Sequence, residues 1–188
     1  EPHLLRAQAA EAMDAIDLAR WALKNAMIVA PDHGDGYQRM VRHHGARREW
    51  PEAERMAIRS TRIEPGNPRA WRRLGRCFFS RKRTRASKVQ AIRANLLDPG
   101  DSRTIGDLAE IEQWIGSIPN AARLLRRLCI RDPGSESVWR RRGVFEISRK
   151  RHDLASTVLR RALILAPANI GNMEHYIHAS RFTWSESE

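Results

Sequence analysis

The chain has 188 residues, of which 41% are hydrophobic and 30% are charged, and its formal net charge is +12 at pH 7. This composition can fill one ordinary core, which excludes a disordered chain, and no apolar run approaches the roughly 18 residues of a membrane-spanning helix. The N-terminal segment EPHLLRAQAAEAMDAIDL is acidic rather than basic, so it indicates no targeting signal. The chain begins at Glu1 without a methionine, which favours a piece excised from a longer protein.

Five prolines punctuate the chain at a fixed interval of 34 residues. They are Pro31, Pro65, Pro99, Pro133 and Pro167. Because proline is about one residue in twenty in ordinary proteins, four further hits at one spacing have a chance probability of about one in a hundred thousand. A 34-residue period is the length of a helix-turn-helix unit, so the sequence predicts an array of such units.

The predicted units follow this period along residues 1–188, which we expect to form a single helical-repeat domain. The units are expected at residues 1–33, 34–67, 68–101, 102–135 and 136–169, and a terminal helix at 170–182. The first unit has no glycine or proline turn between its helices, so residues 3–29 predict one long or bent helix. The terminal helix is suited to cap the array.

Each unit repeats the same kinds of side chain at the same positions. The N-cap candidates, two residues after each proline, are His33, Asn67, Asp101, Ser135 and Asn169. The large apolar residues expected to face the core are Tyr37, Trp71, Ile105, Trp139 and Met173. The small residues expected where two helices approach closely are Ala19, Ala53, Ser87, Ala121 and Ala155. These columns predict one helix after each proline turn and a second helix before the next proline.

These columns resemble the tetratricopeptide repeat (TPR) family. The residues that carry the resemblance are Trp71, Leu74, Gly75, Phe78, Ser87, Ala94 and Pro99. The resemblance implies an all-α fold, a right-handed α-solenoid of about five 34-residue helix-turn-helix repeats plus a C-terminal capping helix, with the first helices lining a concave face. His44, Glu112 and Glu146 replace the apolar residue in the column of Phe78, and Arg142 replaces Leu74, which predicts looser packing over residues 136–169.

Two cysteines, Cys77 and Cys129, stand at different phases of the repeat, so no disulfide is expected. Reduced cysteine behaves as a small hydrophobic residue, and we expect both to fill the core. Cysteine usage of this kind indicates a cytoplasmic protein.

The positive charge is concentrated in residues 36–101, where 17 lysines and arginines face 6 acidic residues. Arg69, Arg72, Arg73 and Arg76 are spaced i, i+3, i+4 and i+7 and share one helical face, opposite the apolar one. Alignment of the repeats brings Arg39, Arg42, Arg103, Arg140 and Arg141 beside them. We expect these nine arginines to form a basic groove that binds an acidic peptide or a phosphorylated group, because the guanidinium fork suits both anions.

A structural role for the same arginines is the alternative. Arg73 and Asp107 share one column in adjacent repeats, as do Arg76 and Glu110, so ion pairs between neighbouring helices would explain their spacing. Arginine outnumbers lysine 30 to 4, which also fits a codon bias. TPR proteins that grip a C-terminal carboxylate use asparagine and lysine at defined groove positions, a pattern that Gln38, Arg42 and Arg73 do not match.

The turns inside the repeats form a second basic feature, with the sequences HHGARREW, SRKRTRASK and SRKRHD. Nucleic acid or an anionic lipid surface would suit such an edge. Because Trp71 and Trp139 are expected in the core, exposed aromatic residues for base stacking are few, and nucleic acid is the less favoured partner.

The sequence indicates neither catalysis nor a metal or cofactor site. His175 and His178 stand i, i+3 beside Glu174, but a third ligand at fixed spacing is absent. We therefore expect a non-catalytic scaffold that binds a peptide or protein partner, acidic in character, in the basic groove. The alternative is a regulatory or substrate-docking helical arm of a larger bacterial enzyme such as a transferase, and a lesser alternative is anion binding through the basic turns.

Overall fold

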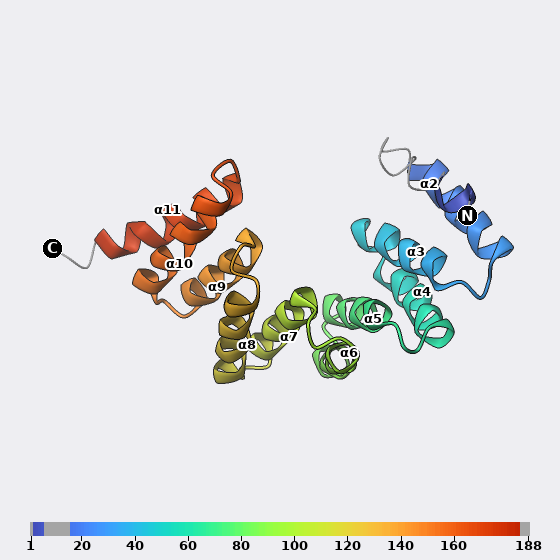
Figure 1. Ribbon diagram of the computed structural model, residues 1–188, viewed down its shortest axis with the longest axis horizontal. Coiled ribbons are helices and arrows are strands. Elements are labelled where there is room, and N and C mark those ends of the chain that lie inside the picture. The colour runs from blue at the N-terminus through green and yellow to red at the C-terminus, as the bar shows by residue number, and fades with distance from the viewer. Residues whose placement is uncertain (1, 6–15, 185–188) are drawn as a thin grey trace. The chain divides into compact units, whose positions relative to one another are not determined.

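The computed structural model describes residues 2–5 and 16–184, and every regular element within them is a helix (Figure 1). The helices are α2 (Ile16–Val29), α3 (Gly34–Ala46), α4 (Trp50–Ile63), α5 (Pro68–Ser80), α6 (Thr84–Leu97), α7 (Ser102–Trp114), α8 (Ile118–Arg131), α9 (Glu136–Ser148), α10 (His152–Leu165) and α11 (Ile170–Trp184). The helix expected over residues 3–29 includes residues 6–15, which lie outside the described part. The fold is an all-α solenoid of helical repeats.

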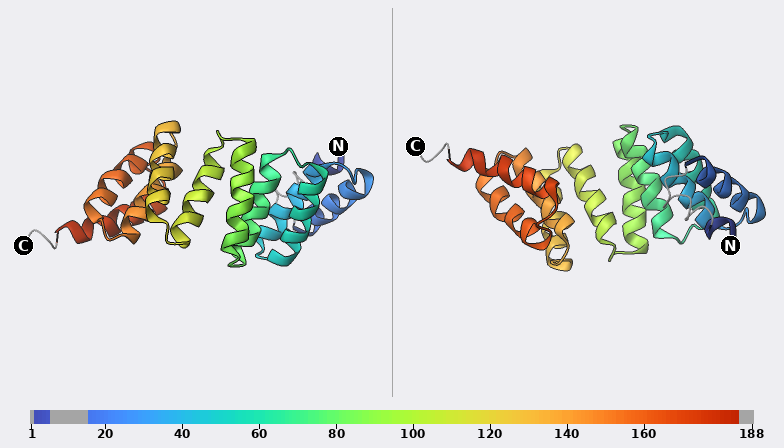
Figure 2. Two further views of the ribbon diagram at one scale, coloured as in Figure 1. Left: turned by 90° about the horizontal axis from the view of Figure 1, so that it is seen from below. Right: turned by 90° about the horizontal axis from the view of Figure 1, so that it is seen from above.

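The first helices of successive repeats begin at Gly34, Pro68, Ser102, Glu136 and Ile170, so the period of the prolines is also the period of the helices. Contacts divide the chain into two compact units, an N-terminal unit, Glu1–Thr104, and a C-terminal unit, Ile105–Glu188. Within the first unit α3 packs on α4 and α5 on α6; within the second α9 packs on α10 and α10 on α11. Figure 2 shows these helices lying side by side.

Three of the expected N-caps make the expected hydrogen bonds. The side chains of Asn67, Asp101 and Asn169 each accept a hydrogen bond from a backbone N–H in the first turn, at 3.0 to 3.3 Å. Ser135 does not cap α9, because its hydroxyl lies 3.0 Å from the hydroxyl of Ser137 instead. His33 makes no side-chain cap either.

The column of small residues is the most closely packed part of the fold. Its members, at most 1% exposed, are Ala19, Ala53, Ser87, Ala121 and Ala155. The four from Ala53 to Ala155 lie on second helices, where a larger side chain would push that helix away from the first helix of its repeat. Cys77 and Cys129 are also buried, and burial raises the pKa of the Cys77 thiol to about 11, as expected of core cysteines.

The large apolar column behaves less uniformly. Tyr37 and Ile105 are buried, whereas Trp71 and Trp139 are half-buried. The indole N–H of Trp71 donates to the carbonyl of Pro65 at 2.7 Å, and Trp139 repeats this bond with Pro133 at 2.8 Å, so each ring ties the helix to the turn before it.

The expectation that Met173 faces the core is wrong. Met173 is 47% exposed, because among the described residues no second helix follows α11 to cover it.

Polar residues in the column of Phe78 are buried and paired. Glu146, 6% exposed, lies 3.8 Å from Arg149 and 3.6 Å from Arg151, both in the turn that follows α9. Where α9 crosses α10 the helices pack closely and not loosely as expected, since a Cβ atom on Gly143 would lie 2.4 Å from a side-chain carbon of Leu159. The replaced apolar residue is compensated by ion pairs within the turn.

A left-handed residue recurs in the turns between the paired helices. Arg48, Lys82 and Lys150 have φ of 59° and Gly116 has φ of 85°, at intervals of 34 residues. The backbone of this turn therefore has one shape in four repeats, although only one of them has the glycine that such a conformation favours.

Candidate functional site

In the N-terminal unit, α5 presents its arginines on the side opposite its buried residues. Leu74, Cys77 and Phe78 are buried, while Arg69 and Arg76 are exposed. The helix is amphipathic because arginines occupy every position of one stripe, as the spacing predicted.

Two of these arginines are tied to neighbouring elements. The Arg73 guanidinium donates to the backbone carbonyl of Gln38 on α3. The Nε atom of Arg72 lies 3.5 Å from Oδ2 of Asp101, and the side chain of Arg72 is only 14% exposed. Arg72 and Arg73 thus brace α5 against the elements on either side of it.

The arginines of this unit are close enough to repel one another. Burial, followed by the charges of Arg42, Arg72 and Arg69, lowers the pKa of Arg73 to about 10, and Asp35 opposes the shift only weakly. Arg73 stays charged at neutral pH, so the cluster carries positive charge that an anion would stabilise. Of the other expected groove residues in this unit, Arg39 is half-buried and Arg103 is exposed.

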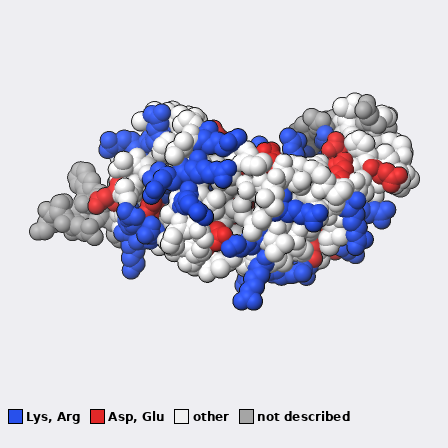
Figure 3. All heavy atoms as spheres, turned by 60° about the horizontal axis from the view of Figure 1, so that its bottom comes forward, with Lys and Arg blue, Asp and Glu red and all other residues white. Residues whose placement is uncertain are grey.

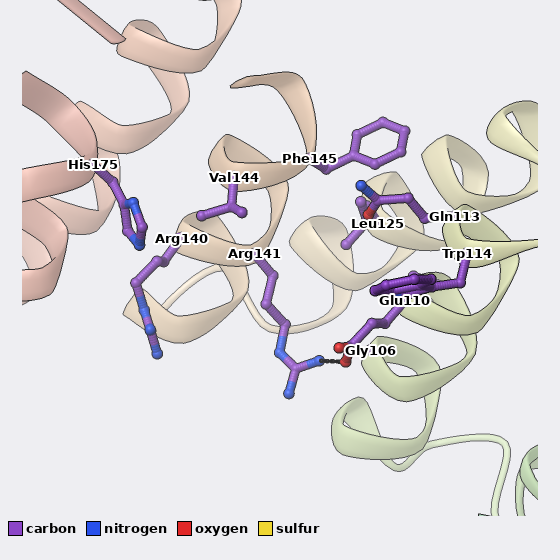
Figure 4. Close-up of a pocket in the computed structure, with 11 residues that line it drawn as sticks. Gly106, Glu110, Gln113, Trp114, Leu125, Arg140, Arg141, Val144, Phe145 and His175 are labelled. Carbon is purple, nitrogen blue, oxygen red and sulfur yellow. Dashed lines mark ion pairs between the residues drawn. The ribbon is translucent and has the colours of Figure 1, made fainter. Parts of the chain in front are cut away.

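The C-terminal unit contains a cavity of about 460 Å³ between α7, α9 and α11 (Figure 4). Its floor consists of Ala109, Leu125 and Phe145, which are at most 4% exposed. One wall is the indole of Trp114, 73% exposed at the end of α7. A cavity of this size with an apolar floor and an aromatic wall is typical of a site that accepts a side chain from a ligand.

Charged side chains surround this cavity. Arg140 and Arg141 on α9 have 40% and 39% of their side chains exposed, and His175 of α11 lines the same cavity. Glu110 of α7 is the acidic side chain in the lining. The lining therefore contains two arginines and one carboxylate, that of Glu110 on α7, and the Nε atom of Arg140 also lies 3.6 Å from Oε2 of Glu136 on its own helix.

Arg141 is held in place by the acids of the preceding repeat. Its Nη1 atom lies 3.8 Å from Oδ1 of Asp107. The same atom lies 3.9 Å from Oε2 of Glu110, the pair marked by the dashed line in Figure 4. Gly106 lets the guanidinium lie flat against α7, because a Cβ atom there would be 3.0 Å from Nη1. Asp107 and Glu110 thus make inter-repeat ion pairs with Arg141; pairing with Arg73 and Arg76 stays a prediction.

Sequence reasoning missed Trp114. In the first helices α3, α5 and α9 this position is Ala46, Ser80 and Ser148, all small, and in the terminal helix the sequence has Phe182, so the tryptophan stands out among the paired helices. That contrast was the available signal for a large aromatic residue kept for the surface.

A stack of helix pairs that repeats every 34 residues defines a helical-repeat protein. The family model for the tetratricopeptide repeat matches residues 39–95 and 115–170, well over half of the chain. The chain belongs to the tetratricopeptide repeat family. A search of curated proteins finds no match to the sequence.

Solved structures of TPR proteins share the fold. A thermophilic TPR protein of Thermus thermophilus has a TM-score of 0.84 at 14% identity, covering 95% of this chain and 97% of its own. Pseudomonas aeruginosa pilF has a TM-score of 0.80 at 13% identity, covering 99% and 85%. YrrB, described as a TPR protein with an unusual peptide-binding site, has a TM-score of 0.65 at 16% identity, covering 92% and 89%.

Two further features concern metal and membrane. The part of the chain that the structure describes contains no group of three or more His, Cys, Asp or Glu side chains placed to hold a metal ion. None of the helices within residues 2–5 and 16–184 is long and apolar enough to cross a bilayer.

Proposed function

We propose that this chain is a non-catalytic scaffold for protein–protein interaction, and that the cavity between α7, α9 and α11 binds a peptide with an apolar side chain next to a carboxylate. The observation that carries the proposal is the combination of a buried apolar floor with a cationic rim. The floor and Trp114 offer contact area to an aliphatic or aromatic side chain, and Arg140 with His175 offers donors to an acid beside it.

Glu110 narrows the choice of ligand. Its carboxylate lies near Arg141 and repels a second acid on the α7 side, so a single acidic residue suits the cavity better than a polyacidic run. The arginine cluster of the N-terminal unit supports an acidic partner independently, since Arg73 and its neighbours are under mutual repulsion that bound anions would relieve. Peptide binding is also the property named for YrrB, whose fold is similar.

Titration of the chain with fluorescent peptides tests the proposal. A peptide with phenylalanine or leucine next to glutamate should bind, and its amide counterpart with glutamine should bind less, with a difference that shrinks as salt rises. Arg140→Gln should weaken binding about tenfold, and Trp114→Ala by more than about tenfold. Arg160→Gln removes an exposed arginine of α10 outside the cavity and serves as the matched control.

Equal affinity for the glutamate and glutamine peptides would contradict the cationic rim as the recognition element. If the Trp114→Ala variant bound the peptide as tightly as the unchanged protein, the cavity would not be the peptide-binding site. The substitutions lie at exposed or half-exposed side chains, so circular dichroism should show an intact fold in each variant.

A further inference from the structure

Exposed aliphatic residues recur at one position of the second helices. Leu96 of α6 is 74% exposed, Ile130 of α8 is 77% exposed and Ile164 of α10 is 64% exposed. Ile28 of α2, 76% exposed, has the same register, and only α4 departs from it, with Arg62 at this position, among the second helices that the structure describes. Single exposed apolar residues are ordinary on protein surfaces. Recurrence at 34-residue spacing is not, because the solvent side of an amphipathic helix is normally polar. A regular feature of this kind indicates a surface that something covers.

In the C-terminal unit these residues stand among arginines. Ile130 follows Arg126 and Arg127 by four and three residues, and Ile164 follows Arg160 and Arg161 in the same way, so each pair lies on the same helical face as its isoleucine. All four arginines are exposed.

The outer surface of α8 is hollowed and free of acid. The helix has arginines at four positions and no aspartate or glutamate in its sequence. Two hollows of about 480 and 430 Å³ lie on it, both lined by Arg123 and Arg126 and the larger one also by Ile130, and no acidic side chain lines either. In the face turned to the viewer in Figure 3, blue Lys and Arg atoms outnumber red Asp and Glu atoms.

We propose that the outer face of α8 and α10, defined by Arg126, Ile130, Arg160 and Ile164, binds the surface of an anionic lipid bilayer. The isoleucines enter the boundary between headgroups and acyl chains, and the arginines bind lipid phosphates while their methylene stems stay in apolar surroundings. This face belongs to the second helices, whereas the peptide cavity lies between first helices, so the two sites are separate.

The chemistry of the face favours lipid over macromolecules of other classes. Protein–protein interfaces are enriched in aromatic residues and methionine as well as arginine, but the larger hollow on α8 is lined by arginines and one isoleucine, with no aromatic residue or methionine. Single-stranded nucleic acid stacks on exposed aromatic rings, and the exposed tryptophan of this repeat, Trp114, lines the peptide cavity and neither of the two hollows on α8. An anionic bilayer can bind both kinds of side chain at once, because arginines bind the lipid phosphates and isoleucines insert into the apolar region beneath them.

Co-sedimentation of the full chain with vesicles tests the proposal. The chain should sediment with vesicles of phosphatidylcholine mixed with phosphatidylglycerol and should stay in solution with phosphatidylcholine alone. Ile130→Ser with Ile164→Ser, and separately Arg126→Gln with Arg160→Gln, should each weaken binding on the order of tenfold. A matched control, Arg69→Gln with Arg103→Gln, removes two exposed arginines from α5 and α7 and should leave binding unchanged.

Three results would overturn the proposal. One is equal binding to both kinds of vesicle or to neither. A second is loss of binding in the arginine variant with full binding in the isoleucine variant, since plain electrostatic adsorption needs no exposed isoleucine. The third is binding of a single-stranded oligonucleotide that the arginine variant loses, without any binding to vesicles. The isoleucine variant should still bind the peptide of the cavity, which separates failure of this proposal from failure of that one.

Discussion

The contact between Gly143 and Leu159 offers the sharpest test of how the repeats pack. A Cβ atom on Gly143 would lie 2.4 Å from Cγ and 2.5 Å from Cδ2 of Leu159, and Leu159 is fully buried, so its side chain has no space to move into. Gly75 stands at the same position of an earlier repeat and faces Ala91, with its nearest neighbour, the carbonyl oxygen of Ser87, at 3.3 Å. The same substitution should therefore have opposite results at the two glycines.

The magnitudes follow from two terms. Glycine to alanine inside a helix gains about 1 kcal/mol of helix propensity, and forcing an extra methyl into a filled core costs about 1–3 kcal/mol. Gly143→Ala should thus destabilise the protein by up to about 2 kcal/mol, while Gly75→Ala should be neutral or slightly stabilising. Leu159→Ala alone should cost about 2–5 kcal/mol, because it leaves a cavity.

The double variant decides between packing and other causes. With Leu159→Ala already present, Gly143→Ala should stabilise by about 1 kcal/mol, since the clash is gone and the propensity gain remains. Urea unfolding followed by far-ultraviolet circular dichroism measures all four proteins. If Gly143→Ala destabilises equally with and without Leu159, the close contact between α9 and α10 is not the cause, and the packing described for this repeat is wrong.

Three further predictions concern the polar parts of the fold. Glu54→Gln should lower the unfolding free energy in urea by about 1–2 kcal/mol, because its carboxylate pairs with Arg81 at 2.6 Å and Arg83 at 2.8 Å, an effect limited by the partial exposure of both arginines. Asp101→Asn should lower the melting temperature at neutral pH. Burial would raise the pKa of Asp101, but hydrogen bonds from Thr104 and Arg103 and the charge of Arg72 lower it below the ordinary 3.8. The ionised carboxylate therefore stabilises the fold above pH 3.8, and this stabilisation is lost as the pH falls through the lowered pKa. Lys82→Gly should stabilise by about 0.5–1 kcal/mol in the same urea assay, because φ of 59° suits glycine.

The repeat register could be read from the sequence because it depends on side-chain size at single positions. A helix pair brings its axes close only where both side chains are small, and Ala53, Ser87 and Ala121 satisfy this at 34-residue spacing. The starts of the first helices could be predicted in the same way, from each proline and the polar residue two positions after it. Both patterns depend on single positions and recur in the repeats, so they can be recognised from the sequence alone.

The features that the sequence did not predict depend on which neighbour a side chain reaches. Column alignment suggested Arg73 as a partner of Asp107, a pairing that stays a prediction, and it did not point to Arg141 of the next repeat, whose Nη1 atom lies 3.8 Å from Oδ1 of Asp107. Met173 has the right size and register for the core and is nevertheless 47% exposed, because among the described residues no helix after α11 covers it. Register gives the face on which a residue lies, while its partner depends on the element packed against that face.

The basic turns illustrate why net charge alone is a weak guide to ligands. Arg81 and Arg83 belong to the turn SRKRTRASK, which has five lysines and arginines and no acidic residue in its sequence. In the structure both arginines nevertheless pair with Glu54 of α4, whose side chain is 12% exposed. Within the chain, other arginines lie over aromatic rings, as Arg93 does over Trp71 at 3.9 Å. A substantial part of the +12 charge is therefore engaged within the fold.

The arginines that matter for a ligand are consequently defined by their surroundings and not by their number. Those of the cavity in the C-terminal unit stand above buried apolar side chains, and those of the outer face stand beside exposed isoleucines; in both places a cation and an apolar group are offered together. A ligand that supplies only negative charge gains little at either place, because exposed ion pairs are weak in water. We therefore expect both surfaces to select amphipathic anions, a short acidic peptide with an apolar side chain in one case and an anionic lipid surface in the other, and salt alone should weaken each interaction without abolishing it.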